Sequence, residues 1–232
     1  MDTTPLAIKI MSIRAIETKA FRIGVNCYLL ETGLGYVLID SGWSAARSDL
    51  DTELLNAGCK PGMLSLIIQT HGDLDHAGNA AYLRNKHAAK IAIHEADAGM
   101  VERGDMSWNR KANPLVRILF SLPPGRLSKE DRFSPDILLA NETDLAGYGL
   151  DARVVYLPGH SKGSIGILTT KGDLFCGDLL TNTGKPALNS IMDDKGAGAA
   201  SLEKVRSLGV RTIHPGHGKS FPADLLPDAP TK

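Results

Sequence analysis

The sequence predicts a mixed α/β protein with two β-rich halves and helices between them. Residues 27–31 and 36–40 are strand-like, and Gly33-Leu34-Gly35 separates them as a hairpin turn would. Apolar runs then alternate with helical segments as far as residue 94, and β-structure resumes at Ile137. We therefore expect a single domain over residues 1–232.

Helices and strands alternate after the hairpin. The expected elements are, in order, a helix over 44–56, a strand over 64–68, a helix from residue 77 and a strand over 90–94. Ser44 or Ser48 is expected to cap the first of these helices, and Gly58 to close it.

Residues 97–136 differ from their surroundings, because they combine Pro123-Pro124-Gly125 with an apolar stretch at 115–120. We expect an insertion with a short amphipathic helix, which packs on the core, covers the substrate or forms a dimer contact. After it come the expected strands 137–139, 153–157, 164–168 and 174–176, a helix over 196–207 and a strand over 210–213. The proline-rich tail from about residue 222 is expected to fray.

The composition is that of an ordinary globular protein, with 43% hydrophobic and 22% charged residues. Lys+Arg and Asp+Glu both total 26, and this balance argues against a nucleic-acid partner. No apolar stretch approaches the roughly 20 residues of a membrane span, and Met1–Pro5 lacks the pattern of a secretion signal. The three cysteines are widely spaced, which suits buried thiols and a cytoplasmic location.

The most informative segment is Thr-His-Gly-Asp-Leu-Asp-His at residues 70–76. It follows a buried strand and contains four potential metal ligands, which are His71, Asp73, Asp75 and His76. Imidazole and carboxylate groups at this spacing can be directed at a divalent cation by a tight loop. This segment therefore predicts a metal site.

Three later segments share one layout, in which a strand ends in a loop with Gly or Pro and a ligand-type residue. They present His160 after Pro158-Gly159, Asp178 after Gly177, and His217 after Pro215-Gly216. Together with the first loop this gives seven nitrogen and oxygen ligands, enough for two divalent ions and a bridging solvent oxygen.

These motifs, in this order, resemble those of the metallo-β-lactamase superfamily over about residues 20–220. The resemblance implies a four-layer αβ/βα sandwich with two metals at one edge of two facing sheets. It also implies that His71, Asp73 and His160 bind one metal, that Asp75, His76 and His217 bind the other, and that Asp178 bridges them. Asp40, in Leu-Ile-Asp-Ser-Gly, matches an early aspartate that shapes the site from behind.

Asp73 departs from the family pattern, which has histidine at this position. Two dications bring four positive charges, and Asp73, Asp75, Asp178 and a hydroxide bring four negative ones. This neutral cluster should be a weaker Lewis acid than one with histidine at position 73. Zinc is the expected metal, and the extra oxygen donor makes manganese or iron an alternative.

The resemblance implies a metal-dependent hydrolase in which a metal-bridging hydroxide attacks an ester, lactone or thioester. Asp75 is expected to handle a proton as well as bind metal. The expected partner is a small-molecule substrate; a membrane partner is not expected, and a homodimer is left open. Only 14 residues follow Gly218, which argues against the helical C-terminal domain of glyoxalase II-type enzymes. Two alternatives remain: a phosphodiesterase or nuclease-type enzyme, and a non-catalytic metal-binding or regulatory protein on the same fold.

Several other residues have competing interpretations. His214 either donates to a ligand carboxylate or is an ordinary strand-end residue. Lys162 either touches substrate or is a solvated loop lysine. Cys176 is expected to be a small core residue, and His87 and His94 are not expected to be ligands.

Overall fold

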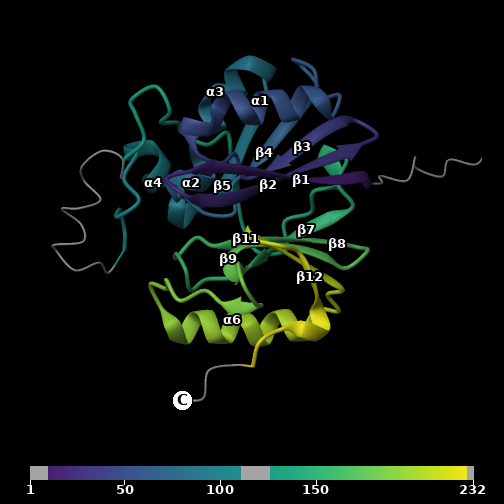
Figure 1. Ribbon diagram of the computed structural model, residues 1–232, viewed down its shortest axis with the longest axis vertical. Coiled ribbons are helices and arrows are strands. Elements are labelled where there is room, and N and C mark those ends of the chain that lie inside the picture. The colour runs from purple at the N-terminus through teal and green to yellow at the C-terminus, as the bar shows by residue number, and fades with distance from the viewer. Residues whose placement is uncertain (1–9, 111–125, 229–232) are drawn as a thin grey trace, which may run out of the picture.

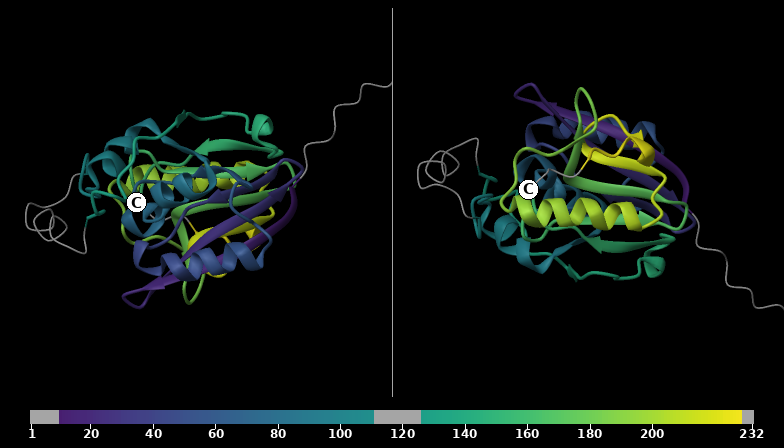
Figure 2. Two further views of the ribbon diagram at one scale, coloured as in Figure 1. Left: turned by 90° about the horizontal axis from the view of Figure 1, so that it is seen from above. Right: turned by 90° about the horizontal axis from the view of Figure 1, so that it is seen from below.

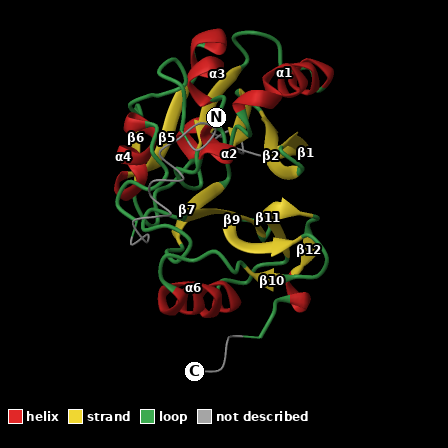
Figure 3. Cartoon of the chain, turned by 60° about the vertical axis from the view of Figure 1, so that its left-hand side comes forward, coloured by secondary structure: helices red, strands yellow, loops and turns green. Residues whose placement is uncertain are grey.

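The computed structural model describes residues 10–110 and 126–228. Two sheets face each other, and helices cover the outer side of each (Figure 1). Seen from the side, the layers are α1 and α3, the first sheet, the second sheet and α6 (Figure 3). The expected four-layer αβ/βα sandwich is therefore confirmed.

The first sheet has six strands in sequence order. They are β1 (Ile10–Ala20), β2 (Ile23–Thr32), β3 (Gly35–Ile39), β4 (Leu64–Ile68), β5 (Lys90–His94) and β6 (Ile137–Leu139). The first three are antiparallel, and β3 to β6 are parallel. The β1–β2 turn places Phe21 and Arg22 at φ 52° and 68°, as a two-residue hairpin with the twist of its strands requires.

Helical segments connect the parallel strands. They are the 3-10 turn η1 (Ser44–Ala46) and the helices α1 (Arg47–Asn56), α2 (Leu74–Ala77), α3 (Ala80–His87) and α4 (Glu95–Arg103). The expected serine cap of the first helix is wrong, because Ser44 begins the 3-10 turn and Ala46 is the N-cap of α1. Gly58, at φ 85°, does end this segment as expected.

The second sheet runs in the order β12-β11-β9-β8-β7, and β10 pairs with β9. Its strands are β7 (Ala152–Tyr156), β8 (Ile165–Thr169), β9 (Asp173–Asn182), β10 (Ala187–Leu188), β11 (Thr212–Gly218) and β12 (Phe221–Pro222). The 3-10 turn η2 (Ala146–Tyr148) precedes β7, and η3 (Ala223–Leu225) follows β12. The helix α6 (Lys195–Ser207) crosses the outer face of this sheet (Figure 2).

The expected insertion at 97–136 begins inside α4, so its first residues belong to a regular helix of the fold. The apolar stretch at 115–120 lies outside the described residues. The tail expected to fray from residue 222 is folded at its start, because β12 and η3 cover residues 221–225.

Apolar side chains of the two sheets meet in the middle of the sandwich. Ile39 and Ile68 from the first sheet and Ile167 and Phe175 from the second are all fully buried there. Complete burial of such side chains stabilises the fold by about 1.5–3 kcal/mol each. This core holds the two sheets together, and polar residues at the strand ends lie along one edge of the sandwich. None of the described helices has the length and apolar character needed to cross a bilayer.

Candidate metal centre

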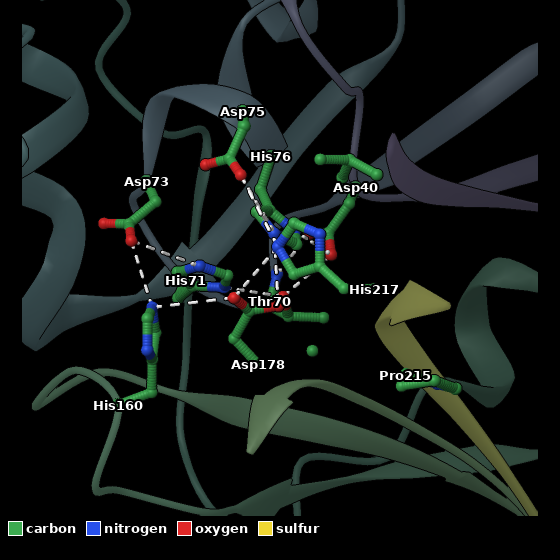
Figure 4. Close-up of polar contacts among 12 residues, drawn as sticks. Asp40, Thr70, His71, Asp73, Asp75, His76, His160, Asp178, Pro215 and His217 are labelled. Carbon is green, nitrogen blue, oxygen red and sulfur yellow. Dashed lines mark hydrogen bonds and ion pairs between the residues drawn. The ribbon is translucent and has the colours of Figure 1, made fainter. Parts of the chain in front are cut away.

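The seven predicted side chains lie together at one edge of the sandwich (Figure 4). Three overlapping groups have ligand atoms within 4.8 Å of one another: His71, Asp73 and His160; Asp75, His76 and His217; and His71, His76 and Asp178. The structure therefore brings together every residue that the motifs predicted. Their role as metal ligands stays a prediction.

The first four residues come from the segment that follows β4. His71 and Asp73 lie in the loop, and Asp75 and His76 lie in the short helix α2. The buried strand β4 ends directly before them, because the main chain bends away from the sheet at Thr70. The helix then turns His76 back toward the second sheet, where its imidazole is fully buried.

The other three come from the second sheet. His160 lies in the loop after β7, as expected. Asp178 and His217 were expected in loops, and this is wrong, because they lie within β9 and β11. Gly177 has φ 51°, and the pairing of β11 with β9 shifts register on both sides of Pro215. These irregularities bend the strands and direct both side chains to the edge.

The ligand-type atoms of the two halves face one another at close range. His160 Nε2 lies 3.0 Å from Asp73 Oδ2. Asp178 lies between the groups, with Oδ1 3.3 Å from His76 Nε2 and Oδ2 3.2 Å from His217 Nε2. His160 Nε2 is also 3.9 Å from Asp178 Oδ2. This central place is the one that a bridging carboxylate would occupy.

Each imidazole has an oxygen at Nδ1, which leaves Nε2 to face the cluster. His160 donates from Nδ1 to the Ile191 carbonyl at 2.7 Å, and His217 donates to the Gly24 carbonyl at 2.7 Å. His76 Nδ1 lies 2.9 Å from Asp40 Oδ2. Such partners fix the ring orientation and the tautomer that metal binding requires.

Asp40 supports the cluster from behind, as the resemblance implied. It is 2% exposed, has φ 58°, and accepts hydrogen bonds from the Thr70 main chain and hydroxyl, both at 2.8 Å. The Thr70 hydroxyl in turn lies 3.0 Å from His71 Nδ1. A single buried carboxylate thus orients both His71 and His76.

Burial and ion pairing act in opposite directions on these groups. Burial raises the pKa of Asp73 and Asp178, but Arg110 beside Asp73 and His76 beside Asp178 outweigh it and hold both well below the usual range. Burial lowers the pKa of His160, but its hydrogen bond to Asp73 outweighs this and raises it to about 9. The pKa of His71 falls, because burial and the neighbouring His76 both disfavour its cation.

The donor set fits divalent ions. His71 Nε2, His76 Nε2 and Asp178 Oδ1 are buried and have no hydrogen-bond partner among the described residues. Buried polar atoms left without partners cost free energy, so such a group of them is the mark of a ligand that completes the site. Four imidazole nitrogens and three carboxylates are donors that suit zinc, iron and manganese.

Asp97 was missed from the sequence. It lies in the first turn of α4, is 1% exposed, and accepts hydrogen bonds from Gly72 N at 3.1 Å, Ser161 Oγ at 2.6 Å and Gly163 N at 2.8 Å. Asp97 therefore joins the His71 loop to the His160 loop. A charged residue that shares the helix face of Met100 and Val101, both buried, was the available signal.

Arg110 was also missed. Its guanidinium forms ion pairs with Asp73, with Nη2 2.7 Å from Oδ1, and with Asp193, with Nε 3.5 Å from Oδ2. It lies in the 97–136 segment, where no motif pointed to it.

The structure shows the contacts of four further residues that had competing interpretations or were not expected to bind metal. His214 contacts Asp173 at 3.1 Å and Ser220 at 2.9 Å, which favours an ordinary structural role. Lys162 donates to Asn109 Oδ1 at 2.5 Å. Cys176 is a buried free thiol, as expected. His94 caps α4 by accepting from Ala96 N at 3.2 Å.

Two named enzymes are among the relatives of this chain. Hydroxyacylglutathione hydrolase from Anaeromyxobacter dehalogenans is 27% identical over 196 residues, which cover 84% of this chain and 62% of that protein. Acyl-coenzyme A thioesterase MBLAC2 from Bos taurus is 27% identical over 214 residues, which cover 85% of this chain and 71% of that protein. The chain spans about two thirds of the length of the first curated relatives it matches.

Among solved structures, TTHA1623 in a di-iron-bound form matches with a TM-score of 0.69 and 28% identity, over 91% of this chain and 96% of that one. The family model of the metallo-beta-lactamase superfamily matches residues 21–217. This match includes all seven residues of the cluster. The chain therefore belongs to the metallo-beta-lactamase superfamily.

Proposed function

We propose that this protein is a metal-dependent hydrolase that cleaves a thioester or ester of a small molecule. The observation that carries the proposal is the convergence of four Nε2 atoms and three carboxylates at the sheet edge. One ion would be held by His71, Asp73 and His160, the other by Asp75, His76 and His217, with Asp178 between them. When bound, two such ions activate water as a nucleophile and polarise the acyl oxygen.

Asp75 is the carboxylate best placed to take up a proton during the reaction. Its side chain is 17% exposed, whereas those of Asp73 and Asp178 are 7% exposed. Asp75 Oδ2 lies 3.6 Å from His217 Nε2, at the more open end of the cluster. A substrate that enters from this end reaches Asp75 before the other two carboxylates.

A cleft of about 870 Å³ supports a substrate with an anionic portion. Three cationic side chains and one acidic one line it: Lys19, Arg22, Lys219 and Glu17. Gly24 also lines it, and the carbonyl of Gly24 is the acceptor for His217. The cleft therefore borders the main chain that supports His217 at Nδ1, and none of the seven cluster residues lines it. The thiol portions of glutathione and coenzyme A thioesters, which two relatives are named for, are anionic.

The test is a hydrolysis panel on protein stripped with a chelator and then reloaded with zinc, manganese or iron(II). The panel holds an S-acyl glutathione, an acyl-coenzyme A, an aryl ester, a lactone and a bis-aryl phosphate. We expect thioester cleavage that disappears on stripping and returns with metal. His76→Ala should abolish it, while His214→Gln, a histidine change outside the cluster, should retain it.

The other outcomes separate the alternatives. Turnover of the bis-aryl phosphate alone would make the protein a phosphodiesterase. Stoichiometric metal uptake without turnover of any compound would make it a non-catalytic metal-binding protein.

A further inference from the structure

Arg110 is a largely buried cation in direct contact with the candidate metal centre. Its side chain is 10% exposed, and Nη2 lies 2.7 Å from Asp73 Oδ1 and 3.5 Å from His160 Nε2. Asp193, whose side chain is 20% exposed, holds Nε from the more open side at 3.5 Å. The guanidinium is thus fixed between one carboxylate of the cluster and one outside it.

The two oxygens of Asp73 have different surroundings. Oδ2 faces the imidazoles, at 3.0 Å from His160 Nε2 and 3.7 Å from His71 Nε2. Oδ1 faces Arg110. A carboxylate can bind a metal through one oxygen or two, and here the second oxygen already forms an ion pair with Nη2 of Arg110.

Arg110 also changes the charge of the cluster. Asp73, Asp75 and Asp178 bring three negative charges, and Arg110 brings one positive charge, which leaves two negative. A histidine at position 73 without the arginine would also leave two negative charges. Asp193 is farther from the cluster and more exposed, so solvent screens its charge more strongly.

We propose that Arg110 is the charge-compensating partner of Asp73. It keeps Asp73 a single-oxygen ligand and gives the site the net charge of an analogue with five histidines and two aspartates. This inference rests on the metal site of the proposed function, but it concerns the ligand geometry and not the substrate. Arg110 is a positioning residue, because it acts through Asp73.

The experiment is a double-mutant cycle with Arg110→Met, Asp73→His and the double variant, read by metal affinity. Each protein is titrated with cobalt(II) and zinc(II) in competition with a chromophoric chelator. Asp73→His alone leaves Asp193 as the one acidic partner of Arg110 named above, and the excess positive charge then lies beside the metals. We therefore expect the metal affinity to fall by about 10- to 100-fold, as for loss of an outer-shell partner. The double variant removes this positive charge and should recover most of the lost affinity.

The visible spectrum of bound cobalt gives a second readout. Arg110→Met frees Oδ1 of Asp73 for the metal, so the coordination number should rise and the absorption should weaken. Arg110→Lys keeps the charge but cannot contact Asp73 and Asp193 through two separate nitrogens of one plane. Its cobalt spectrum should therefore lie between those of the wild type and Arg110→Met. Arg153→Met is the control, because Arg153 pairs with Glu142 at 2.9 Å in an exposed pair outside the cluster.

Unfolding of the metal-free proteins keeps the test decisive if a variant is unstable or if no metal binds. If Arg110 and Asp73 act as a pair, the free energy of unfolding should fall less in the double variant than the sum of its decreases in the two single variants. Additive effects in both metal affinity and unfolding, with an unchanged cobalt spectrum in Arg110→Met, would overturn the proposal. A protein that binds metal with this coupling but hydrolyses nothing overturns only the proposed function.

Discussion

The carboxylate of Asp97 accepts a hydrogen bond from the Ser161 hydroxyl at 2.6 Å, and this bond joins α4 to the loop that carries His160. Two main-chain N–H groups, of Gly72 and Gly163, donate to the same carboxylate. Asp97 therefore joins the His71 loop to the His160 loop from one side of the cluster, whereas Asp40 supports the segment from Thr70 to His76 from behind.

Asp97→Asn should loosen these two loops, because the amide has one acceptor oxygen where the carboxylate has two. We expect the free energy of unfolding to fall by about 1.5–3 kcal/mol, the usual contribution of a hydrogen bond to a charged group. Metal affinity should fall by about 10- to 100-fold, as for other outer-shell partners. Denaturant unfolding and chelator competition measure the two effects, and unchanged metal affinity would contradict the positioning role.

Gly216→Ala should disturb the cluster directly. A Cβ at this position would lie 2.3 Å from Asp178 Oδ1 and 2.6 Å from His76 Cε1, and both side chains are held by other contacts. We expect metal affinity to fall by about 10-fold or more. Gly184→Ala is the matched control, since a Cβ there meets no atom within 4 Å. Equal metal affinities in the two variants would show that the approach at Gly216 is not critical.

Lys219→Met should weaken binding of anionic thioesters. Lys219 is exposed and lines the cleft beside His217. Loss of one exposed ionic contact of about 0.2–1 kcal/mol should raise KM by about 1.5- to 5-fold with kcat little changed. A neutral thioester should show no difference, and Lys60→Met, a lysine outside the cleft, should have no effect. An equal rise in KM for both substrates would argue against an anion-binding role.

The stability of the metal-free protein should depend on the protonation of His214. Burial lowers the pKa of His214 below its usual 6.5, and the hydrogen bond to Asp173 opposes this only in part. As the pH falls through about 6.5, the unfolded chain therefore takes up a proton more readily than the native state, and the free energy of unfolding decreases. Above this pH, His214 is neutral in both states and no longer lowers the free energy of unfolding.

His214→Gln removes this titration, so its stability should fall less steeply than that of the wild type between about pH 7 and pH 5. Urea unfolding across this range gives both curves. The cluster titrates in both proteins, so the difference between their two stability curves reports on His214 alone. Parallel curves would contradict the assignment.

The seven cluster residues could be predicted because each occupies a short motif at the end or bend of an apolar strand. The spacing of His71 to His76 places four donors on one loop and one helical turn, and no distant contact is needed to see this. The positions of Asp178 and His217 inside strands could not be predicted, because they depend on φ at Gly177 and on the register of β11 against β9.

Arg110 could not be predicted for a different reason. Its place beside Asp73 depends on the path of the chain after α4, which local propensity does not determine. Asp97 was closer to prediction, because an acidic residue on a buried helix face requires a partner. The strands and the core could be predicted, because their apolar residues follow a strong hydrophobic pattern along the chain.

Each of the three groups of potential metal ligands combines residues from before β7 with residues from after it. A chain cleaved between β6 and β7 would yield two fragments, neither of which retains a complete trio. Metal uptake is thus a reporter of fragment reassembly: separately expressed pieces should bind ions weakly, and mixing them should restore tight binding only when the sandwich re-forms.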